Sequence, residues 1–428
     1  MTSERECFVY IVLPGETEFV TAARFRVSKT RDGNAAGEFV YGKRYLERAD
    51  AVELDPVELK LTATRSETTR MGGFFGAIRD ATPDFWGRRV IERNAGLPQL
   101  EDFDYLMQGP DDRAGALGFG LNAIPPAPRR KFNRTLDLDS LQTMAQAILN
   151  DDADSIASDS ISRQAQELPL EGTSMGGARP KAVVEDHHGL WIAKFSSPQD
   201  RWNQPLVEHA FLNLAKNCGL NVADSKIATV AGKAVLLVRR FDRDRDDNGY
   251  RRHRMVSALT LLRSDEDPTS RENWSYLSLA DEIRRTSASP VADLRELFAR
   301  MCFNAIVSNL DDHPRNHAIL AKDKSWRLSP AYDLTPTPTL APDTRLLAMV
   351  CGTQGRIARR DNLLTACGRF LLSRDEAGKI IDNIVNVVRA EWDASLHRAG
   401  AGEKDMASIA SARIYDGFFY TAEPATPQ

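Results

Sequence analysis

A polar stretch that interrupts an apolar helix constrains the fold of this chain more than any other part of its sequence. Apolar side chains recur at three- and four-residue steps over residues 294–306, and this pattern predicts a buried helix. The polar residues 308–316 follow directly, and short apolar runs within residues 317–328 indicate a hairpin. Such a hairpin would bring the acidic Asp333 back to face Asn316. The sequence therefore predicts a polar site at the end of this helix.

The side chains of this polar stretch have the types and the spacing that phosphoryl transfer requires. Asp311 and Asn316 are five residues apart, which is the separation of Asp and Asn in the catalytic loop of protein kinases. Asp333 follows seventeen residues later, where a kinase carries a metal-binding Asp. Asp311 would take the proton of the attacking hydroxyl, and the other two would hold Mg²⁺ between the phosphates. The same residues also suit a polar turn around Pro314, so the local pattern alone leaves both interpretations open.

A Gly-rich loop precedes a predicted strand in the middle of the chain. Residues 172–184 read Gly-Thr-Ser-Met-Gly-Gly-Ala-Arg-Pro-Lys-Ala-Val-Val, and glycines allow backbone amides to approach phosphate oxygens. Arg179 or Lys181 would add positive charge to such a site. The loop is not a Walker A motif, because no Gly-Lys-Ser/Thr ends it. By itself, a Gly-rich hairpin is more often structural than functional.

A lysine and a glutamate after this loop lie where kinases carry an ion pair. Lys194 ends an apolar strand about twenty residues after the loop, as does the kinase lysine that pairs with the phosphates. An apolar stripe over residues 207–218 predicts the next helix, which Gly219 would end. Glu208 lies beside this stripe, placed to hold Lys194. A solvated strand-end lysine and a solvated glutamate near a helix N-terminus are the alternative interpretations.

The next strand turns polar at the point where a kinase hinge binds the adenine edge through backbone groups. Residues 234–238 are apolar and predict a buried strand, and Arg-Arg-Phe-Asp follows over residues 239–242. Asp242 would reach the ribose, although an ordinary strand-end aspartate fits the local sequence nearly as well. The highly charged residues 244–254 predict a surface loop.

Changes in composition along the chain predict three domains. Residues 1–150 would form an N-terminal α+β accessory domain, because β-type runs separated by glycines indicate a small antiparallel sheet. An acidic, Ser-rich stretch from residue 151 to residue 162 is the expected flexible boundary. Residues 151–250 would form a nucleotide-binding lobe, and residues 251–428 a helical lobe. Strands are expected over residues 8–13, 19–27 and 38–45, and helices over residues 255–262, 277–285 and 376–392.

Charge and cysteine content exclude several classes of protein. The net charge of −4 and the pI of about 6.1 give no global positive field that would recruit nucleic acid. The sequence has no apolar run long enough to span a bilayer, and its N-terminus lacks the apolar core of a secretion signal. Five scattered cysteines without a CxxC pair predict a reduced, cytoplasmic protein without disulfides.

A local basic cluster lies near the C-terminal end of the chain. Its residues, Arg356, Arg359 and Arg360, would face DNA or a peptide, unless they form an ordinary solvated face.

Five motifs occur in order along the chain and resemble those of one known protein family. They are Ser174-x-Gly-Gly-Ala-Arg-Pro-Lys181, Trp-Ile-Ala-Lys194, Arg-Arg-Phe-Asp242-Arg, Asp311-Asp-His-Pro-Arg-Asn316 and Tyr-Asp333. Together they resemble the HipA family of serine/threonine kinases, the toxins of bacterial type II toxin–antitoxin modules. The resemblance covers roughly residues 165–420, and it extends into the N-terminal domain through residues 74–84 and 111–116.

The resemblance implies an α+β, protein-kinase-like fold of the HipA and phosphoinositide-kinase type. It implies a bilobal arrangement with a β-rich N-terminal accessory subdomain and an all-helical C-terminal lobe. Family members use ATP with Mg²⁺ and bind a small helix-turn-helix antitoxin of the HipB type as a repressor complex. DNA would therefore be contacted only through the antitoxin. Known targets of the family are aminoacyl-tRNA synthetases, and no membrane is involved.

The resemblance also implies a role for each matching residue. Asp311 would be the catalytic carboxylate, and Asn316 and Asp333 would be the Mg²⁺ ligands. Ser174 falls where the family is autophosphorylated, and Glu208 would be the structural ion-pair residue. The implied nucleotide-binding residues are Ser174, Gly176, Gly177, Lys181, Lys194, Arg239, Phe241, Asp242 and His313.

The sequence departs from related patterns at three places and leaves the phosphate acceptor open. At one of them, Leu334 follows Asp333 in place of the Gly of conventional kinases, which fits the HipA pattern. Asn309-Leu310 precedes Asp311 in place of the His-Arg of conventional kinases, which fits the HipA pattern. Arg179-Pro180 replaces a polar pair in the phosphate loop of the best-known toxin. A small-molecule kinase and a non-catalytic co-repressor of a DNA-binding antitoxin are the alternatives to a protein kinase. The presence of the lysine, both aspartates and the asparagine of the kinase pattern favours an enzyme.

Overall fold

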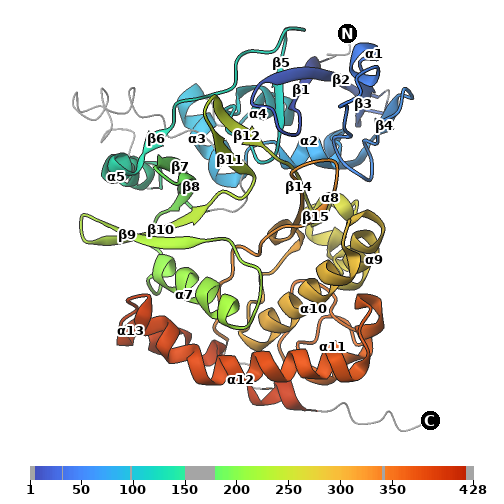
Figure 1. Cartoon of the computed structure of the whole chain (residues 1–428). Helices are drawn as coiled ribbons and strands as arrows, with labels where there is room; N and C mark the ends of the chain where they lie inside the picture. Colours follow the sequence, from blue (N-terminus) through green and yellow to red (C-terminus); the bar gives the residue numbers. More distant parts are fainter. Residues whose placement is uncertain (1–4, 31, 97–98, 150–178, 340–342, 421–428) are drawn as a thin grey trace. The chain divides into compact units, whose positions relative to one another are not determined.

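The protein, seen here in a computed structural model, divides into two compact units that each combine segments distant in sequence (Figure 1). The structure describes residues 5–30, 32–96, 99–149, 179–339 and 343–420. The first unit comprises Met1–Pro198, Ala228–Asp265 and Ala318–Trp326. The second unit comprises Gln199–Ile227, Glu266–His317 and Arg327–Gln428. The three domains expected from the sequence, with their two boundaries, stay a prediction.

The first unit begins with a five-stranded antiparallel sheet in the order β4-β3-β2-β1-β5. The strands expected over residues 8–13 and 19–27 are confirmed in this sheet. The strand expected over residues 38–45 is wrong at its end, because the chain turns into the short helix α1 after Gly42. There Tyr45 is buried and its hydroxyl donates to the Val52 carbonyl at 2.7 Å. The elements are β1 (Arg5–Val12), β2 (Phe19–Lys29), β3 (Ala35–Tyr41), α1 (Lys43–Leu46), β4 (Ser66–Thr68) and β5 (Leu117–Gly120).

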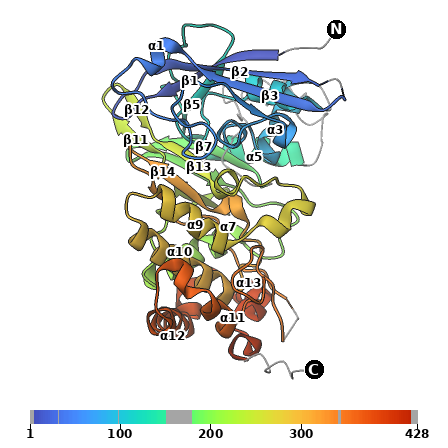
Figure 2. The same ribbon diagram turned by 90° about the vertical axis from the view of Figure 1, so that its right-hand side faces the viewer.

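A second sheet has the order β6-β7-β8-β10-β9, and the helices α3 and α5 lie together beside it (Figure 2). Buried side chains of α3 and α5 form one apolar core with those of β7, β8 and β10. The predicted strands that lead to Lys194 and to Arg239 are confirmed. The elements are α3 (Phe85–Ala95), α5 (Leu138–Leu149), β6 (Asn133–Arg134), β7 (Lys181–Asp186), β8 (Gly189–Lys194), β9 (Ser225–Val230) and β10 (Lys233–Arg239).

Two further segments of the first unit differ from their predicted structure. The charged residues 244–254 form a hairpin, β11 paired with β12, instead of a loop. The predicted helix over residues 255–262 is a strand at its start, because β13 pairs with β14 before α8 begins. Both differences depend on cross-strand partners, which local sequence does not reveal. The elements are α2 (Gly76–Asp80), α4 (Asp102–Gln108), β11 (Arg243–Asp246), β12 (Gly249–Arg252), β13 (Arg254–Ser257), α8 (Ala258–Leu261) and β14 (Ala318–Ala321).

The second unit is mainly helical, and its long helix α12 packs against α7 and α10 (Figure 1). Phe211 of α7 meets Trp392 of α12 edge-on, with 5.0 Å between the ring centroids. The four predicted helices of this unit are confirmed, and the fold class is α+β, as expected. Short strands interrupt the C-terminal half of the chain, which is therefore mainly helical rather than all-helical. The elements of this unit are α7 (Gln204–Asn217), α9 (Tyr276–Thr286), α10 (Pro290–Ile306), β15 (Arg327–Leu328), α11 (Arg360–Thr365), α12 (Arg374–Arg398) and α13 (Glu403–Ile409).

All five cysteines are buried and carry no disulfide. Burial raises the pKa of the Cys7 and Cys218 thiols to about 12, so these groups stay protonated and act as small apolar core residues. Within the described residues, no helix has both the length and the apolar character needed to cross a bilayer.

A buried carboxylate makes the stability of the first unit depend on pH. Asp55 is fully buried, and its Oδ1 accepts the backbone N–H groups of Val57, Glu58 and Leu59 at 2.6–3.2 Å. Burial nevertheless raises the pKa of Asp55 from 3.8 to about 6. The folded state therefore binds the proton more tightly than the unfolded state. This contribution to stability is full below pH 3.8 and is lost as the pH rises through about 6.

We expect Asp55→Asn to remove this pH dependence. The amide keeps an oxygen for the three N–H groups and does not ionise. The unfolding free energy of the variant, relative to wild type, should rise by up to about 3 kcal/mol between about pH 4 and about pH 7. Urea titrations at a series of pH values measure this difference. A difference that stays constant across the series would contradict the raised pKa.

Candidate functional site

The polar loop after α10 places two neighbouring aspartates in opposite environments. Asp311 is exposed, whereas Asp312 is only 1% exposed. In the described part of the chain, no hydrogen bond or ion pair holds the Asp311 carboxylate. Its backbone carbonyl accepts the His313 N–H at 2.8 Å and Nδ2 of Asn316 at 3.4 Å. The loop therefore presents one accessible carboxylate beside the Asn316 amide.

Asp312 anchors this loop to the interior of the second unit. Its Oδ2 accepts hydrogen bonds from the Tyr276 hydroxyl, from Nδ2 of Asn304 at 2.7 Å and from Nε2 of His317 at 2.7 Å. Burial, together with the neighbouring Asp312 carboxylate, raises the pKa of Tyr276 well above its ordinary value. The hydroxyl therefore remains a donor at all physiological pH values. This network turns Asp312 inward and leaves Asp311 facing outward.

The segment that carries Asp333 runs beside the end of the same loop. The Tyr332 hydroxyl donates to the Arg315 carbonyl at 2.7 Å. Because Tyr332 directly precedes Asp333 and Arg315 directly precedes Asn316, this bond brings the two segments together. The backbone of Asp333 has a φ of 58°, in the left-handed region that residues with a side chain rarely adopt. Backbone strain of this kind is concentrated at functional sites. The predicted proximity of the Asp333 segment to the Asn316 segment is therefore seen within the second unit.

The oxygen donors of Asn316 and Asp333 suit Mg²⁺. The Asn316 amide nitrogen donates to the Asp311 carbonyl, which leaves its amide oxygen as an acceptor, and Asp333 supplies a carboxylate. Mg²⁺ prefers such oxygens and usually completes its shell with water and substrate phosphates. Among the residues that the structure describes, no group of three or more His, Cys, Asp or Glu side chains could hold a metal. A Mg²⁺ ion held by these two residues would complete its shell with water and phosphate oxygens.

Lys194 ends β8, a central strand of the second sheet in the first unit. It is half-buried, and its backbone is paired with that of Lys181 on β7 and Leu236 on β10. Glu208 belongs to the second unit, where it is 2% exposed on α7, so the interpretation as a solvated helix residue is wrong. The ion pair between Lys194 and Glu208 stays a prediction.

The other implied nucleotide-binding residues have different environments. Arg239 is exposed at the end of β10, and Phe241 is half-buried two residues later. His313 is half-buried in the polar loop, with its ring centroid 6.3 Å from that of Trp274. The residues of the Gly-rich loop, Ser174, Gly176 and Gly177, lie outside the described residues.

Lys181 belongs to the interior packing of the first unit, and its predicted role at a phosphate stays a prediction. Its side chain is 2% exposed, and its Nζ donates to Oδ2 of Asp84 at 2.6 Å. Asp84 also caps α3, because its Oδ1 accepts the Gly87 N–H at 2.7 Å. Trp86 completes the junction by donating from Nε1 to the Lys181 carbonyl at 3.0 Å. These bonds join the start of β7 to α3.

Asp242 is likewise enclosed by the first unit, and its predicted contact with a ribose stays a prediction. The residue is fully buried, and its carboxylate accepts hydrogen bonds from Arg240, from Arg243 and from the Gly115 N–H. These bonds fit the alternative interpretation, a structural residue at the strand end. The predicted basic cluster is similarly neutralised in part, since Arg359 pairs with Asp361.

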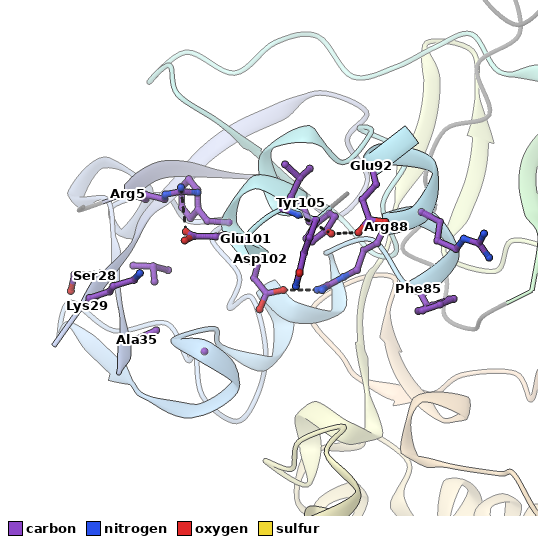
Figure 3. Close-up of a pocket in the computed structure, with 16 residues that line it drawn as sticks. Arg5, Ser28, Lys29, Ala35, Phe85, Arg88, Glu92, Glu101, Asp102 and Tyr105 are labelled. Atoms are coloured by element: carbon purple, nitrogen blue, oxygen red, sulfur yellow. Dashed lines mark hydrogen bonds and ion pairs between the residues drawn. The ribbon is translucent and has the colours of Figure 1, made fainter. Parts of the chain in front are cut away.

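A pocket of about 660 Å³ in the first unit lies between β2, α3 and the start of α4 (Figure 3). None of the implied site residues that the structure describes lines it. Arg5 pairs with Glu101 at 3.2 Å, and Arg88 pairs with Asp102 at 2.7 Å across its wall. These two ion pairs neutralise four of the charged side chains that line the pocket.

The residues that support the polar loop were not predicted from the sequence. Tyr276, Asn304 and His317 are buried around Asp312 and come from α9, from α10 and from the end of the loop. One signal was present, because Asn304 is a polar residue within the apolar pattern of residues 294–306. A buried amide on such a helix requires a hydrogen-bond partner.

Comparisons with known proteins identify relatives for most of the chain. A family model described as the HipA-like C-terminal domain matches residues 173–392. A protein from Sinorhizobium fredii named "Putative kinase Y4mE" is 33% identical over 357 residues, covering 78% of this chain and 80% of that protein. A "Putative kinase" from Haemophilus influenzae is 25% identical over 223 residues, covering 47% of this chain and 64% of that protein.

A solved structure shows the same fold. It is the Shewanella oneidensis MR-1 toxin–antitoxin complex of HipA, HipB and operator DNA, which matches with a TM-score of 0.62. The match covers 94% of this chain and 94% of that chain at 15% identity, so it bears on the fold alone. The family model spans just over half of the 428 residues, and the S. fredii relative exceeds 30% identity over most of the chain. This chain therefore belongs to the family of proteins with a HipA-like C-terminal domain.

Proposed function

We propose that this protein is an ATP-dependent serine/threonine protein kinase of the HipA toxin type. The observation that carries the proposal is the hydrogen bond from Tyr332 to the Arg315 carbonyl, since it brings the Asp333 segment to the Asn316 segment. The exposed carboxylate of Asp311 lies in the same loop. Family membership and the names of two relatives as kinases support the assignment.

In this proposal Asp311 accepts the proton of the attacking hydroxyl. Its exposure leaves room for a substrate hydroxyl, and the buried anchor at Asp312 fixes the loop so that the carboxylate is held in place. Asn316 and Asp333 would hold Mg²⁺, which when bound neutralises phosphate charge during transfer. Lys194 would pair with the phosphates, and Arg239 and Phe241 would line the adenosine.

The partners follow from the same family assignment. The related Shewanella structure contains HipB and operator DNA. We therefore propose that this protein binds a small helix-turn-helix antitoxin and that only the antitoxin contacts DNA. We propose a protein acceptor in the cytoplasm, with an aminoacyl-tRNA synthetase as the first candidate from family precedent. Autophosphorylation at Ser174 would regulate the protein's own kinase activity. Transfer of radiolabel from ATP to proteins of a cell lysate, with and without Mg²⁺, tests the activity and identifies the acceptor.

Binding of MgATP should stabilise the protein against heat. At about 100 times the dissociation constant, a ligand that binds only the folded state adds about 2.7 kcal/mol to the free energy of unfolding. Asp333→Ala should remove the Mg²⁺-dependent part of this stabilisation, because it deletes a proposed metal ligand. Scanning calorimetry with ATP alone and with MgATP measures both quantities.

The matched control is Asp393→Ala. Asp393 is exposed on α12 and makes a surface ion pair with Arg413 at 3.1 Å. This variant should keep the full MgATP effect. A wild-type protein whose unfolding temperature does not move at millimolar MgATP would rule out the proposed function.

A further inference from the structure

The side chains of residues 239–242, directly at and after the end of β10, alternate between exposed or half-buried and fully buried positions. Arg239 is exposed and Phe241 is half-buried, whereas Arg240 and Asp242 are fully buried. Pairing with β8 continues as far as Arg240, whose N–H donates to the Leu190 carbonyl at 2.9 Å. The residues that we propose to line adenosine are thus separated by residues that point into the first unit.

The guanidinium of Arg240 is bonded on three sides. Its Nε donates to Oδ1 of Asp242 at 3.0 Å, and its Nη2 donates to Oδ2 at 2.8 Å. Its Nη1 donates to Asp112, and Nη2 also donates to the Arg113 carbonyl at 2.8 Å. Asp112 is 5% exposed and lies 128 residues earlier, in the loop between α4 and β5. We call this loop, residues 109–116, the N-terminal loop. It forms hydrogen bonds directly with Arg240, in the middle of the proposed adenosine-binding residues 239–241.

The loop makes a second set of bonds to the same segment. The Gly115 N–H donates to Oδ2 of Asp242 at 2.9 Å, and Arg243 donates to the same oxygen at 2.8 Å. Arg243 also donates to the carbonyls of Arg113 and Gly115 at 2.6 and 2.7 Å. Burial alone would raise the pKa of Asp242, but Arg240 and Arg243 hold it well below its ordinary range. The buried carboxylates and guanidinium groups thus balance one another's charge.

The N-terminal loop has little freedom to adjust. Gly115 has a φ of 76°, and a Cβ built on it would lie 3.3 Å from both the nitrogen and the oxygen of Met255 on β13. The loop is therefore confined between β13 on one side and residues 240–243 on the other. A shift of the loop would be transmitted to the backbone of those residues.

We propose that Asp112 and Arg240 are positioning residues for nucleotide binding, which fix the backbone of residues 239–241 without touching the nucleotide. The inference rests on the proposed function, because it assigns the adenosine to this segment. The physical reason is that the planar guanidinium, bonded to two carboxylates and a carbonyl, allows only one orientation of Arg240. Its neighbours in the chain, Arg239 and Phe241, are then fixed with it.

Three variants of the full chain test this role. Asp112→Asn removes the carboxylate charge but keeps the size of the side chain. Arg240→Lys keeps the positive charge but removes the planar fork. Asp55→Asn is the matched control, because Asp55 is equally buried in the same unit and bonds to the backbone of residues 57–59. The dissociation constant of MgATP, KM, kcat and the unfolding midpoint are measured for each at a temperature well below all midpoints.

We expect Asp112→Asn and Arg240→Lys to raise the dissociation constant of MgATP about 10- to 100-fold, the range found when residues that orient metal ligands are replaced. KM for ATP should rise in parallel, and kcat at saturating MgATP should stay within about twofold of wild type. Asp55→Asn should change only the unfolding midpoint and leave the dissociation constant of MgATP unchanged.

Unchanged MgATP affinity in both folded variants, with lower midpoints, would overturn the inference and leave the cluster a purely structural one. If Asp112→Asn does not fold, Arg240→Lys decides, since it retains the buried charge balance. A wild-type protein that does not bind MgATP would instead overturn the proposed function and this inference together. Measuring whether the wild-type protein binds MgATP therefore distinguishes failure of the inference from failure of the proposed function.

Discussion

Asp311→Asn should reduce phosphoryl transfer by about two orders of magnitude or more, the range of general-base effects, while the protein stays folded. Among the described residues, the exposed side chain has no hydrogen bond or ion pair that the amide would lose, so the free energy of unfolding should change by less than about 0.5 kcal/mol. Affinity for MgATP should remain close to that of wild type, because the proposed metal ligands are Asn316 and Asp333. Initial rates of radiolabel transfer and the MgATP melting shift are measured on the same preparations.

Asp393→Asn provides the matched control for this substitution. It makes the same chemical change on an exposed aspartate of α12, and it should transfer phosphate at the wild-type rate. If Asp311→Asn kept the wild-type rate, Asp311 could not be the base, and the proposed mechanism would lose its catalytic carboxylate. Loss of MgATP binding in Asp311→Asn would show that the residue acts in binding instead.

Asp312→Asn should instead act on stability. The substitution replaces one acceptor oxygen by a donor in a buried network of Tyr276, Asn304 and His317. Donors left without an acceptor in the interior are costly, so we expect the free energy of unfolding to fall by about 2–5 kcal/mol. Urea unfolding followed by circular dichroism measures the loss.

The comparison between the two neighbouring variants makes this prediction specific. Asp311→Asn should have the midpoint of wild type, and Asp312→Asn should have a clearly lower one. The slope of unfolding free energy against urea should be the same in both, since the surface exposed on unfolding does not change. Equal midpoints for Asp312→Asn and wild type would contradict the role of Asp312 as an internal anchor.

Elements with a strong local pattern were predictable from the sequence. The apolar stripe of residues 294–306 correctly predicted the helix α10, and the stripe over residues 207–218 correctly predicted α7. A helix forms its backbone hydrogen bonds within one segment, so its apolar period can be recognised from local sequence. The choice of Asp311 over Asp312 rested on the spacing to Asn316, and the structure gives the two side chains opposite exposure. The assignment of Asp311 as the base itself stays a prediction.

Residues whose environment depends on distant partners were not predictable. Lys181 and Asp242 have the types expected at a nucleotide site, yet both are buried. The partner of Lys181 lies 97 residues earlier, at Asp84, and Gly115, which donates to Asp242, lies 127 residues earlier. Similarly, residues 255–257 form a strand because β14, far along the chain, supplies their partner. A single sequence does not reveal such pairings, since local charge and hydrophobicity suit either outcome.

The ion pairs of the first unit determine which segments of the chain must be inherited together. The region that matches the family model begins at residue 173, but the counter-charges of Lys181 and Arg240 within it include Asp84 and Asp112, which precede it. A chimera that joined this region to an unrelated N-terminus would bury two cations without these carboxylates, an arrangement that proteins rarely tolerate. Exchange of the C-terminal region with a protein that lacks carboxylates at these two positions should therefore succeed only when residues 80–115 are exchanged with it.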